Sequence, residues 1–429
     1  RISTAEHTSA AAIGAKLSDL KLPELSEIMR KCGLVLGVGK VHKVQSLSAF
    51  IQESQSTALE RYTCVHKRKP RKIATAHKSF VPDEVVSIDM GFRNLAFAHV
   101  SRSGKVLEWR RVELLEEAAF EPWVLAKVVE QFVRDILPVR PADRCTYIVE
   151  HQRFRSQGSA AVTNSVMVNN LIEALLYANL RHSGARIEAI NPTQVSTHWR
   201  LPDTWGSTEG GADEESLPAA KADEEPLPAA KAGRGRPPKA KKEAVSAKAK
   251  AKSKQVESIS QTIVRMDRLL KEQKQITSGQ HDAIIQALGG PAPKKRTVRP
   301  AGMRDIDELQ QKGPKQLGTL RDLRRRLIKK ERTIALVQSW MLASLTSKSD
   351  QRGKSQLLPW HAQGYPGEMW PFGASQDMEF SEEMCRMFYA EKKKDDLCDC
   401  IIQAVAWLRW QHSVVDVLDE FGSLCSFPA

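Results

Sequence analysis

The stretch from Val85 to Val100 has the sequence VVSIDMGFRNLAFAHV. An apolar, β-branched run leads into Asp89, Gly91 follows two positions later, and a second apolar run starts at Leu95. This pattern predicts a buried strand, a tight turn and a second strand, with Asp89 at the end of the first. An acid there is costly unless it meets a cation or hydrogen-bond donors. A lone Asp-x-Gly more often marks an aspartate that caps a turn, so the rest of the chain has to decide its role.

The composition of the chain limits the classes of partner that the protein can bind and the compartment that suits it. The 429 residues include 65 Lys and Arg against 51 Asp and Glu, a formal net charge of +14, which favours a polyanionic partner. No apolar run approaches the roughly 18 residues of a membrane span, so we expect none. The seven cysteines show neither the spacing of a zinc site nor a dense disulfide framework. They fit buried thiols in a reducing compartment.

The next hundred residues alternate between strand and helix patterns. We expect strands at 106–114, 145–149 and 186–190, and amphipathic helices at 120–137 and 160–182. Three strands joined by turns, followed by strand–helix–strand units, predict a mixed five-stranded sheet with helices on its faces. Glu150 directly follows the strand 145–149, so a second acid ends a core strand.

Acids also open the last predicted helix, 392–411. Asp395, Asp396 and Asp399 lie within about a 100° arc of that helix, away from its apolar face. Acids in a first turn also stabilise the helix dipole, which is a structural explanation of the trio. Together with the two strand-end acids, however, they form a set that repels itself unless cations neutralise it. Two Mg²⁺ ions held about 4 Å apart by such a set activate water and stabilise the leaving oxygen of a phosphodiester.

The order of these acids resembles that of the RNase H-like nuclease superfamily, which implies an α/β fold. Four motifs together resemble those of the fungal mitochondrial Holliday junction resolvases, relatives of the bacterial RuvC resolvases: SIDMGFRN (87–94), VEHQRFRS (149–156), NPTQV (191–195) and KKDDLCD (393–399). The resemblance covers about residues 16–200 and 315–415. It implies a homodimeric, mitochondrial endonuclease that nicks two opposed strands of a four-way DNA junction. Its cofactor would be Mg²⁺, with Mn²⁺ able to substitute.

The same resemblance implies the roles of the site residues. Asp89 would be shared by both metal ions, and Glu150 and Asp399 would hold one each. Either Asp395 or Asp396 would complete the site, and the RuvC-like spacing of three favours Asp396. Basic and polar residues beside the motifs are expected to hold DNA phosphates; these are Arg93, Gln152, Arg153, Arg155, Lys392, Lys393 and Lys394.

The N-terminus is expected to carry a second DNA-binding segment. Residues 1–15 are small and polar, and we expect them to be flexible. Residues 16–54 predict two short helices around a glycine bend and resemble a SAP domain, a small helical DNA-binding unit. A plain helical hairpin packed on the main domain is the alternative. The predicted apolar faces are formed by Leu17, Leu20, Leu22, Leu25, Ile28 and Met29 in the first helix and Val41, Val44, Leu47, Phe50 and Ile51 in the second.

The catalytic domain is expected in two parts, 85–204 and 316–415. A basic linker, 55–84, would join it to the SAP-like segment, and a tail, 416–429, would follow it. The long insertion at 205–315 is the main departure from compact relatives. Helices are also expected at 256–289 and 319–345.

The insertion begins with low-complexity sequence. ADEESLPAAK (212–221) is repeated almost letter for letter at 222–231, and residues 205–255 are too polar to bury themselves, so we expect disorder. Arg234 and Arg236 lie in an Arg-Gly-Arg-Pro string that resembles an AT-hook, in which both arginines enter a narrow A·T minor groove. A basic linker contains such a string by chance fairly often.

Two rival functions remain at this point. The first is another nuclease of the same fold, such as an RNase H or a transposase-like enzyme. The second is a DNA-organising protein without catalysis, for which the SAP-like segment, the AT-hook-like string and the positive charge suffice. The acid set argues against the second, because a pure DNA binder has no use for it.

Overall fold

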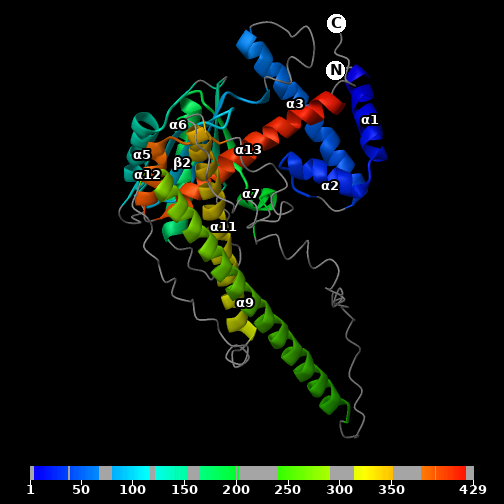
Figure 1. Cartoon of the computed structure of the whole chain (residues 1–429). Coiled ribbons are helices and arrows are strands. Elements are labelled where there is room, and N and C mark those ends of the chain that lie inside the picture. The colour runs from blue at the N-terminus through cyan, green and yellow to red at the C-terminus, as the bar shows by residue number, and fades with distance from the viewer. Residues whose placement is uncertain are drawn as a thin grey trace. The chain divides into compact units, whose positions relative to one another are not determined.

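The computed structural model (Figure 1) describes residues 4–36, 39–66, 80–115, 121–140, 142, 144–151, 164–199, 201, 239–289, 314–350, 378–391 and 393–421. Contacts divide the chain into two compact units. The larger consists of Arg1–Trp199, Gln280–Pro293 and Thr333–Ala429, and the smaller of Arg200–Gly279 and Lys294–Arg332. The larger unit therefore contains the N-terminal helices and most of the two parts of the predicted catalytic domain, whereas residues 200–204 and 316–332 of those parts belong to the smaller unit.

A mixed five-stranded sheet forms the centre of the larger unit, in the order β3-β2-β1-β4-β5. The strands are β1 (Glu84–Asp89), β2 (Leu95–Ser101), β3 (Val106–Val112), β4 (Cys145–Glu150) and β5 (Arg186–Ile190). β1, β2 and β3 pair antiparallel, whereas β1, β4 and β5 run parallel. The predicted RNase H-like α/β fold with a mixed five-stranded sheet is confirmed; the third strand ends two residues earlier than expected.

The two faces of the sheet follow from the alternation of side chains along each strand. One face, which includes Val86, Ile88 and Phe97, packs in a core cluster with residues of three helical segments. These are α5 (Pro122–Gln131), its π-helical continuation η2 (Phe132–Ile136) and α6 (Asn164–His182). The opposite face contacts α13 (Lys394–Phe421), which touches β1, β2 and β3.

The helix α13 is longer than the sequence predicted. It continues to Phe421, whereas the sequence predicted a helix that ends at residue 411 and a tail that begins at residue 416. The helix is longer because Val414, Leu418 and Phe421 are buried. In Figure 1 it is the red helix that passes from the sheet to the N-terminal helices. These are α1 (Thr4–Asp19), α2 (Leu22–Lys31) and α3 (Lys40–His66).

Two predictions for the N-terminal part are wrong. Residues 1–15 were expected to be flexible, but α1 begins at Thr4 because Ile13 and Leu17 pack in one cluster with the end of α13. The linker expected from residue 55 is helical as far as His66, where α3 ends; residues 67–79 lie outside the described part of the chain.

The apolar faces expected for the SAP-like segment are correct only in part. Leu25, Met29, Leu47 and Ile51 are buried as expected. Leu22 and Val41 were placed on these faces but are 44% and 71% exposed, because each lies in the first turn of its helix, turned away from the cluster. The role of this segment in DNA binding stays a prediction.

Two short helices were not expected. α7 (Pro192–His198) begins where the side chain of Asn191 accepts a hydrogen bond of 2.9 Å from the amide of Thr193. Proline at its first position favours the helix start. α12 (Glu382–Ala390) is capped by Ser381, whose hydroxyl oxygen accepts from the amide of Met384.

The insertion contains a long helix where disorder was expected. α9 (Lys239–Ala287) includes residues 239–255, so the prediction of disorder is wrong for this stretch. The stretch is rich in alanine and lysine, which are both strong helix formers. α11 (Pro314–Asp350) contains the predicted helix 319–345. Within the smaller unit Ile263 packs with Leu317, and Arg324 pairs with Asp267 at 2.5 Å.

Residues 202–238, with the AT-hook-like string, lie outside the described part of the chain. Of the helices that are described, none combines the length and apolar composition needed to cross a membrane.

Gly33 seats the end of α2 against α13. It has φ of 69°, and a Cβ added there would lie 2.3 Å from Cδ2 of Trp410. Gly184, which follows α6 with φ of 73°, has nothing within 4 Å of an added Cβ.

We expect Gly184→Ala to lower the free energy of unfolding by about 1–2 kcal/mol through backbone strain. Gly33→Ala should lose roughly 1–3 kcal/mol more through overpacking. Denaturant titration of both variants measures the difference, and equal losses would refute the proposed close contact.

Candidate active site

Two of the predicted acids end neighbouring parallel strands. Asp89 is the last residue of β1 and Glu150 the last residue of β4, and the register places Ile88 opposite Val149. The two carboxyl groups therefore emerge side by side at one edge of the sheet. Both face α13, because Ser87, two residues before Asp89, contacts that helix.

The start of α13 brings two further acids to this edge. Burial, the hydrogen bond with Glu150, and the negative charges of Glu150, Asp399 and Asp396 together raise the pKa of Asp89 well above its usual range. The charge of Asp395, like that of Asp399, acts on the buried thiol of Cys398. The structure thus groups Asp89, Glu150, Asp396 and Asp399. Their roles as metal ligands, and that of Asp395, stay predictions.

The helix position is set by contacts just behind the acids. The indole nitrogen of Trp109 on β3 donates to the carbonyl of Leu397 at 2.9 Å. Leu397, Cys398 and Cys400 are buried around the half-buried Asp399. Because the apolar residues are held against the sheet, the carboxylates between them cannot turn away from the site.

The donor set fits a divalent metal ion. Glu150, Asp396 and Asp399 lie close enough to Asp89 for their negative charges to act on it, and hard divalent cations take carboxylate oxygens as ligands. The raised pKa of Asp89 means that protons and a cation compete for its oxygens. Metal affinity is therefore expected to fall as the pH decreases through that pKa.

Gln403 is a residue of the site that the sequence analysis missed. It is 3% exposed, and its amide nitrogen donates to Oε2 of Glu150 at 3.5 Å. Its carbonyl oxygen accepts from the hydroxyl of Ser87 at 3.3 Å. The pair of contacts orients Glu150 from behind. Its only signal in the sequence is a polar residue one turn after Asp399 among the apolar residues of the helix.

Arg111 on β3 joins the turn after Asp89 to the segment before α13. Its Nη1 donates to Oδ1 of Asn94 at 3.0 Å, and its Nη2 lies 3.2 Å from Oε1 of Glu391. Asn169 of α6 accepts from the amide of Phe92 at 3.2 Å. The turn after Asp89 is therefore held from both faces of the sheet.

The predicted DNA-contacting residues are only partly described. Arg93 and Lys393 are exposed, as phosphate binding requires. Lys394 is half-buried, and its ammonium donates to the carbonyls of Glu391 and Tyr389 at 2.5 and 3.4 Å, so it supports the local backbone. Gln152, Arg153, Arg155, Lys392, Arg234 and Arg236 lie outside the described residues. The DNA contacts of the whole set stay predictions.

The model of the family described as "Mitochondrial resolvase Ydc2 / RNA splicing MRS1" matches residues 85–416. The chain belongs to this family. Its match spans both predicted parts of the catalytic domain and the insertion between them. The resemblance to the mitochondrial junction resolvases is thereby confirmed, and with it the class of enzyme, a junction-resolving nuclease.

Two solved structures are similar to this chain at low sequence identity. The yeast mitochondrial Holliday junction resolvase Ydc2 is 12% identical, covers 94% of this chain and 99% of its own, and has a TM-score of 0.36. Thermus thermophilus RuvC in complex with a Holliday junction substrate is 17% identical, covers 28% of this chain and 71% of its own, and has a TM-score of 0.21. No curated protein matches the chain.

We expect Gln403→Leu to lower metal affinity or the rate of cleavage about 10–100-fold, because it removes the group that orients Glu150 while keeping the volume. Gln411→Leu is the matched control, since Gln411 is a buried glutamine two turns further along α13. Single-turnover cleavage over a Mg²⁺ titration measures the effect. Wild-type rates for Gln403→Leu at every Mg²⁺ concentration would exclude a positioning role.

Proposed function

We propose that the protein is a Mg²⁺-dependent endonuclease that resolves four-way DNA junctions by nicking opposed strands. The observation that carries the proposal is the meeting of four carboxylates from β1, β4 and α13 in a member of the mitochondrial resolvase family. A basic chain with a net charge of +14 suits a nucleic-acid substrate.

The residues divide the work of cleavage among them. Asp89, on which the charges of Glu150, Asp396 and Asp399 all act, is assigned to both ions. Glu150, which accepts a hydrogen bond from Gln403, and Asp399 are assigned to one ion each, with Asp396 completing the site. The ions would supply an activated water and stabilise the leaving 3′ oxygen. The exposed Arg93 and Lys393 are assigned to the phosphates beside the cut.

Paired nicking supports a homodimer. Opposed strands of one junction need two sites, and the described part of one chain holds a single group of these acids. Two copies related by a twofold axis would present one site to each strand. By family, we assign the protein to mitochondria.

The rival functions differ in what they require of the acids. The family description also includes an RNA splicing protein, and a structured-RNA binder needs only a basic surface. The grouped carboxylates favour catalysis over that alternative. RNase H activity needs the same acids, so only the choice of substrate separates it from junction resolution.

Asp89→Asn tests catalysis and substrate together. We expect no nicking of a labelled four-way junction in Mg²⁺, but undiminished junction binding, because binding depends on the basic surface. Wild-type protein should cut the junction in preference to duplex DNA or an RNA–DNA hybrid. Normal nicking by the variant would disprove the assignment of Asp89 to the active site. Preferential cutting of the hybrid by the wild type would show that the substrate is an RNA–DNA hybrid and not a four-way junction.

The same variant has an expected effect on stability. In chelator at neutral pH its Tm should exceed that of the wild type, because one of four repelling charges is gone, and Mg²⁺ should remove the difference. At low pH the difference should also disappear. A raised folded-state pKa means that the wild type loses stability as the pH rises through that pKa.

The aspartate pair gives a second test of the assignment. Asp396→Asn should be nearly inactive, whereas Asp395→Asn should keep measurable cleavage, since of these two first-turn acids it is Asp396 whose charge raises the pKa of Asp89. Loss of a charge favourable to the helix dipole costs only about 0.3–1 kcal/mol. Single-turnover rates over a Mg²⁺ titration compare the two. The opposite ranking would move the metal ligand to Asp395.

A further inference from the structure

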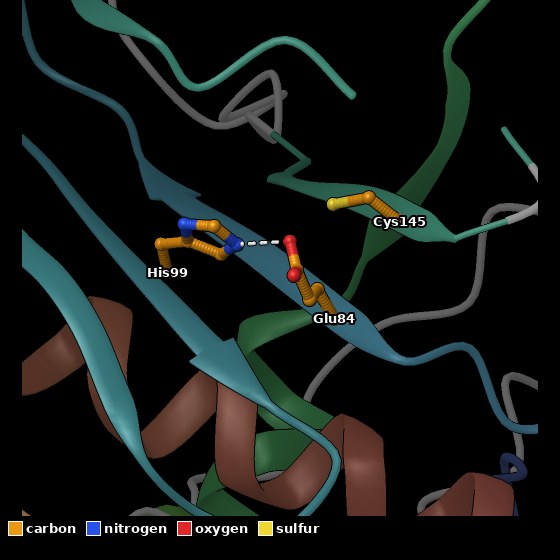
Figure 2. Close-up of side chains that lie close together, drawn as sticks. All are labelled: Glu84, His99 and Cys145. Carbon is orange, nitrogen blue, oxygen red and sulfur yellow. Dashed lines mark hydrogen bonds and ion pairs between the residues drawn. The ribbon is translucent and has the colours of Figure 1, made fainter. Parts of the chain in front are cut away.

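A second group of metal-ligating side chains lies on the other face of the sheet and at the other end of β1. Glu84 is the first residue of β1, and it pairs in register with Cys145, the first residue of β4. His99 comes from β2. One ligand atom from each of the three lies within 4.8 Å of the others. Figure 2 shows the imidazole of His99 directed at the carboxylate, with the sulfur of Cys145 turned toward both.

We propose that Glu84, His99 and Cys145 bind a zinc ion. A nitrogen, a sulfur and an oxygen ligand form the mixed set that Zn²⁺ accepts and that Mg²⁺, a hard ion, does not. With one thiolate, one carboxylate and a neutral imidazole, the occupied site has no net charge, which suits its buried position. A water molecule would complete the tetrahedron.

The geometry is near that of a bound ion. Tetrahedral zinc bonds of about 2.0–2.3 Å separate the ligand atoms by roughly 3.3–3.8 Å. Nε2 of His99 and Oε2 of Glu84 are 2.7 Å apart, and the third ligand lies within the 4.8 Å limit. Side-chain rotations that move the ligand atoms by about an ångström would therefore make room for the ion, with no change in the pairing of the three strands.

The three ligands differ in their exposure to solvent. Cys145 and His99 are 0% and 3% exposed, whereas the side chain of Glu84 is 27% exposed and opens the site to solvent. Burial, and then the charge of Glu84, raise the pKa of Cys145 to about 12, so without a cation the thiol keeps its proton, which zinc would displace. Arg140, 56% exposed and 3.9 Å from Glu84, can turn into solvent when the carboxylate binds zinc.

The site would tie together β2, β1 and β4 at the ends remote from the active site. Five residue steps along β1 place Glu84 about 16 Å from Asp89. The inference does not depend on the nuclease function, since neither the ligand types nor the sheet face is shared with the catalytic acids.

Cobalt spectroscopy tests the proposal on the full chain. Co²⁺ replaces Zn²⁺ in such sites, and a thiolate ligand produces a near-ultraviolet charge-transfer band that carboxylate sites lack. We expect one Co²⁺ per chain with this band, its loss on addition of equimolar Zn²⁺, and a rise of a few degrees in Tm with zinc. Asp89→Asn should retain all three properties.

Matched variants locate the thiolate. Cys145→Ser should lose the band and the zinc-induced rise in Tm, whereas Cys385→Ser, at an equally buried cysteine of α12, should keep both. Glu84→Gln retains the contact with His99 and the fold, and should weaken Co²⁺ binding at least tenfold. Absence of the band in the wild type, or its persistence in Cys145→Ser, would overturn the proposal.

Discussion

Four carboxylates have to be kept at one edge of the sheet although they repel each other. Asp89 and Glu150 are fixed there because they end adjacent strands. Asp396 and Asp399 are kept there only because α13 is anchored by its apolar residues and by two indole groups. Trp109 donates to the carbonyl of Leu397, and Trp199 donates to that of Ile402 at 3.0 Å. Since the helix cannot rotate, a cation or a proton is the remaining way to relieve the repulsion.

The same helix connects the acids with the N-terminal helices. Beyond the sheet, Val414, Leu418 and Phe421 enter one cluster with residues of α1, α2 and α3. Lys16 also donates to the carbonyl of Glu420 at 2.8 Å. The chain therefore builds its predicted second DNA-binding segment around the far end of the helix that carries half of the acids. A change in the packing of one end is expected to reach the other through a single rigid element.

The two ends of β1 differ in their chemistry. At Asp89 the neighbouring groups are carboxylates, which suit hard ions. At Glu84 they are an imidazole and a thiol, which suit softer ones. The strands alternate their side chains, so the first group faces α13 and the second faces the core formed with α5 and α6. The two kinds of ligand thus lie at opposite ends of one short strand and on opposite faces of the sheet.

The sequence by itself determined the succession of strands along the chain, the positions of Asp89 and Glu150 at strand ends, and the family. These depend on local periodicity and on short motifs. It failed where long-range packing decides the structure. The helix from Thr4 and the extension of α13 to Phe421 exist because each buries the other, and neither is visible in its own segment. The contact of Gln403 with Glu150 and the meeting of Glu84 with His99 and Cys145 were also decided only by tertiary structure. Each depends on the register of strands or on the rotation of a helix against the sheet, and the spacing of residues along one segment contains neither quantity.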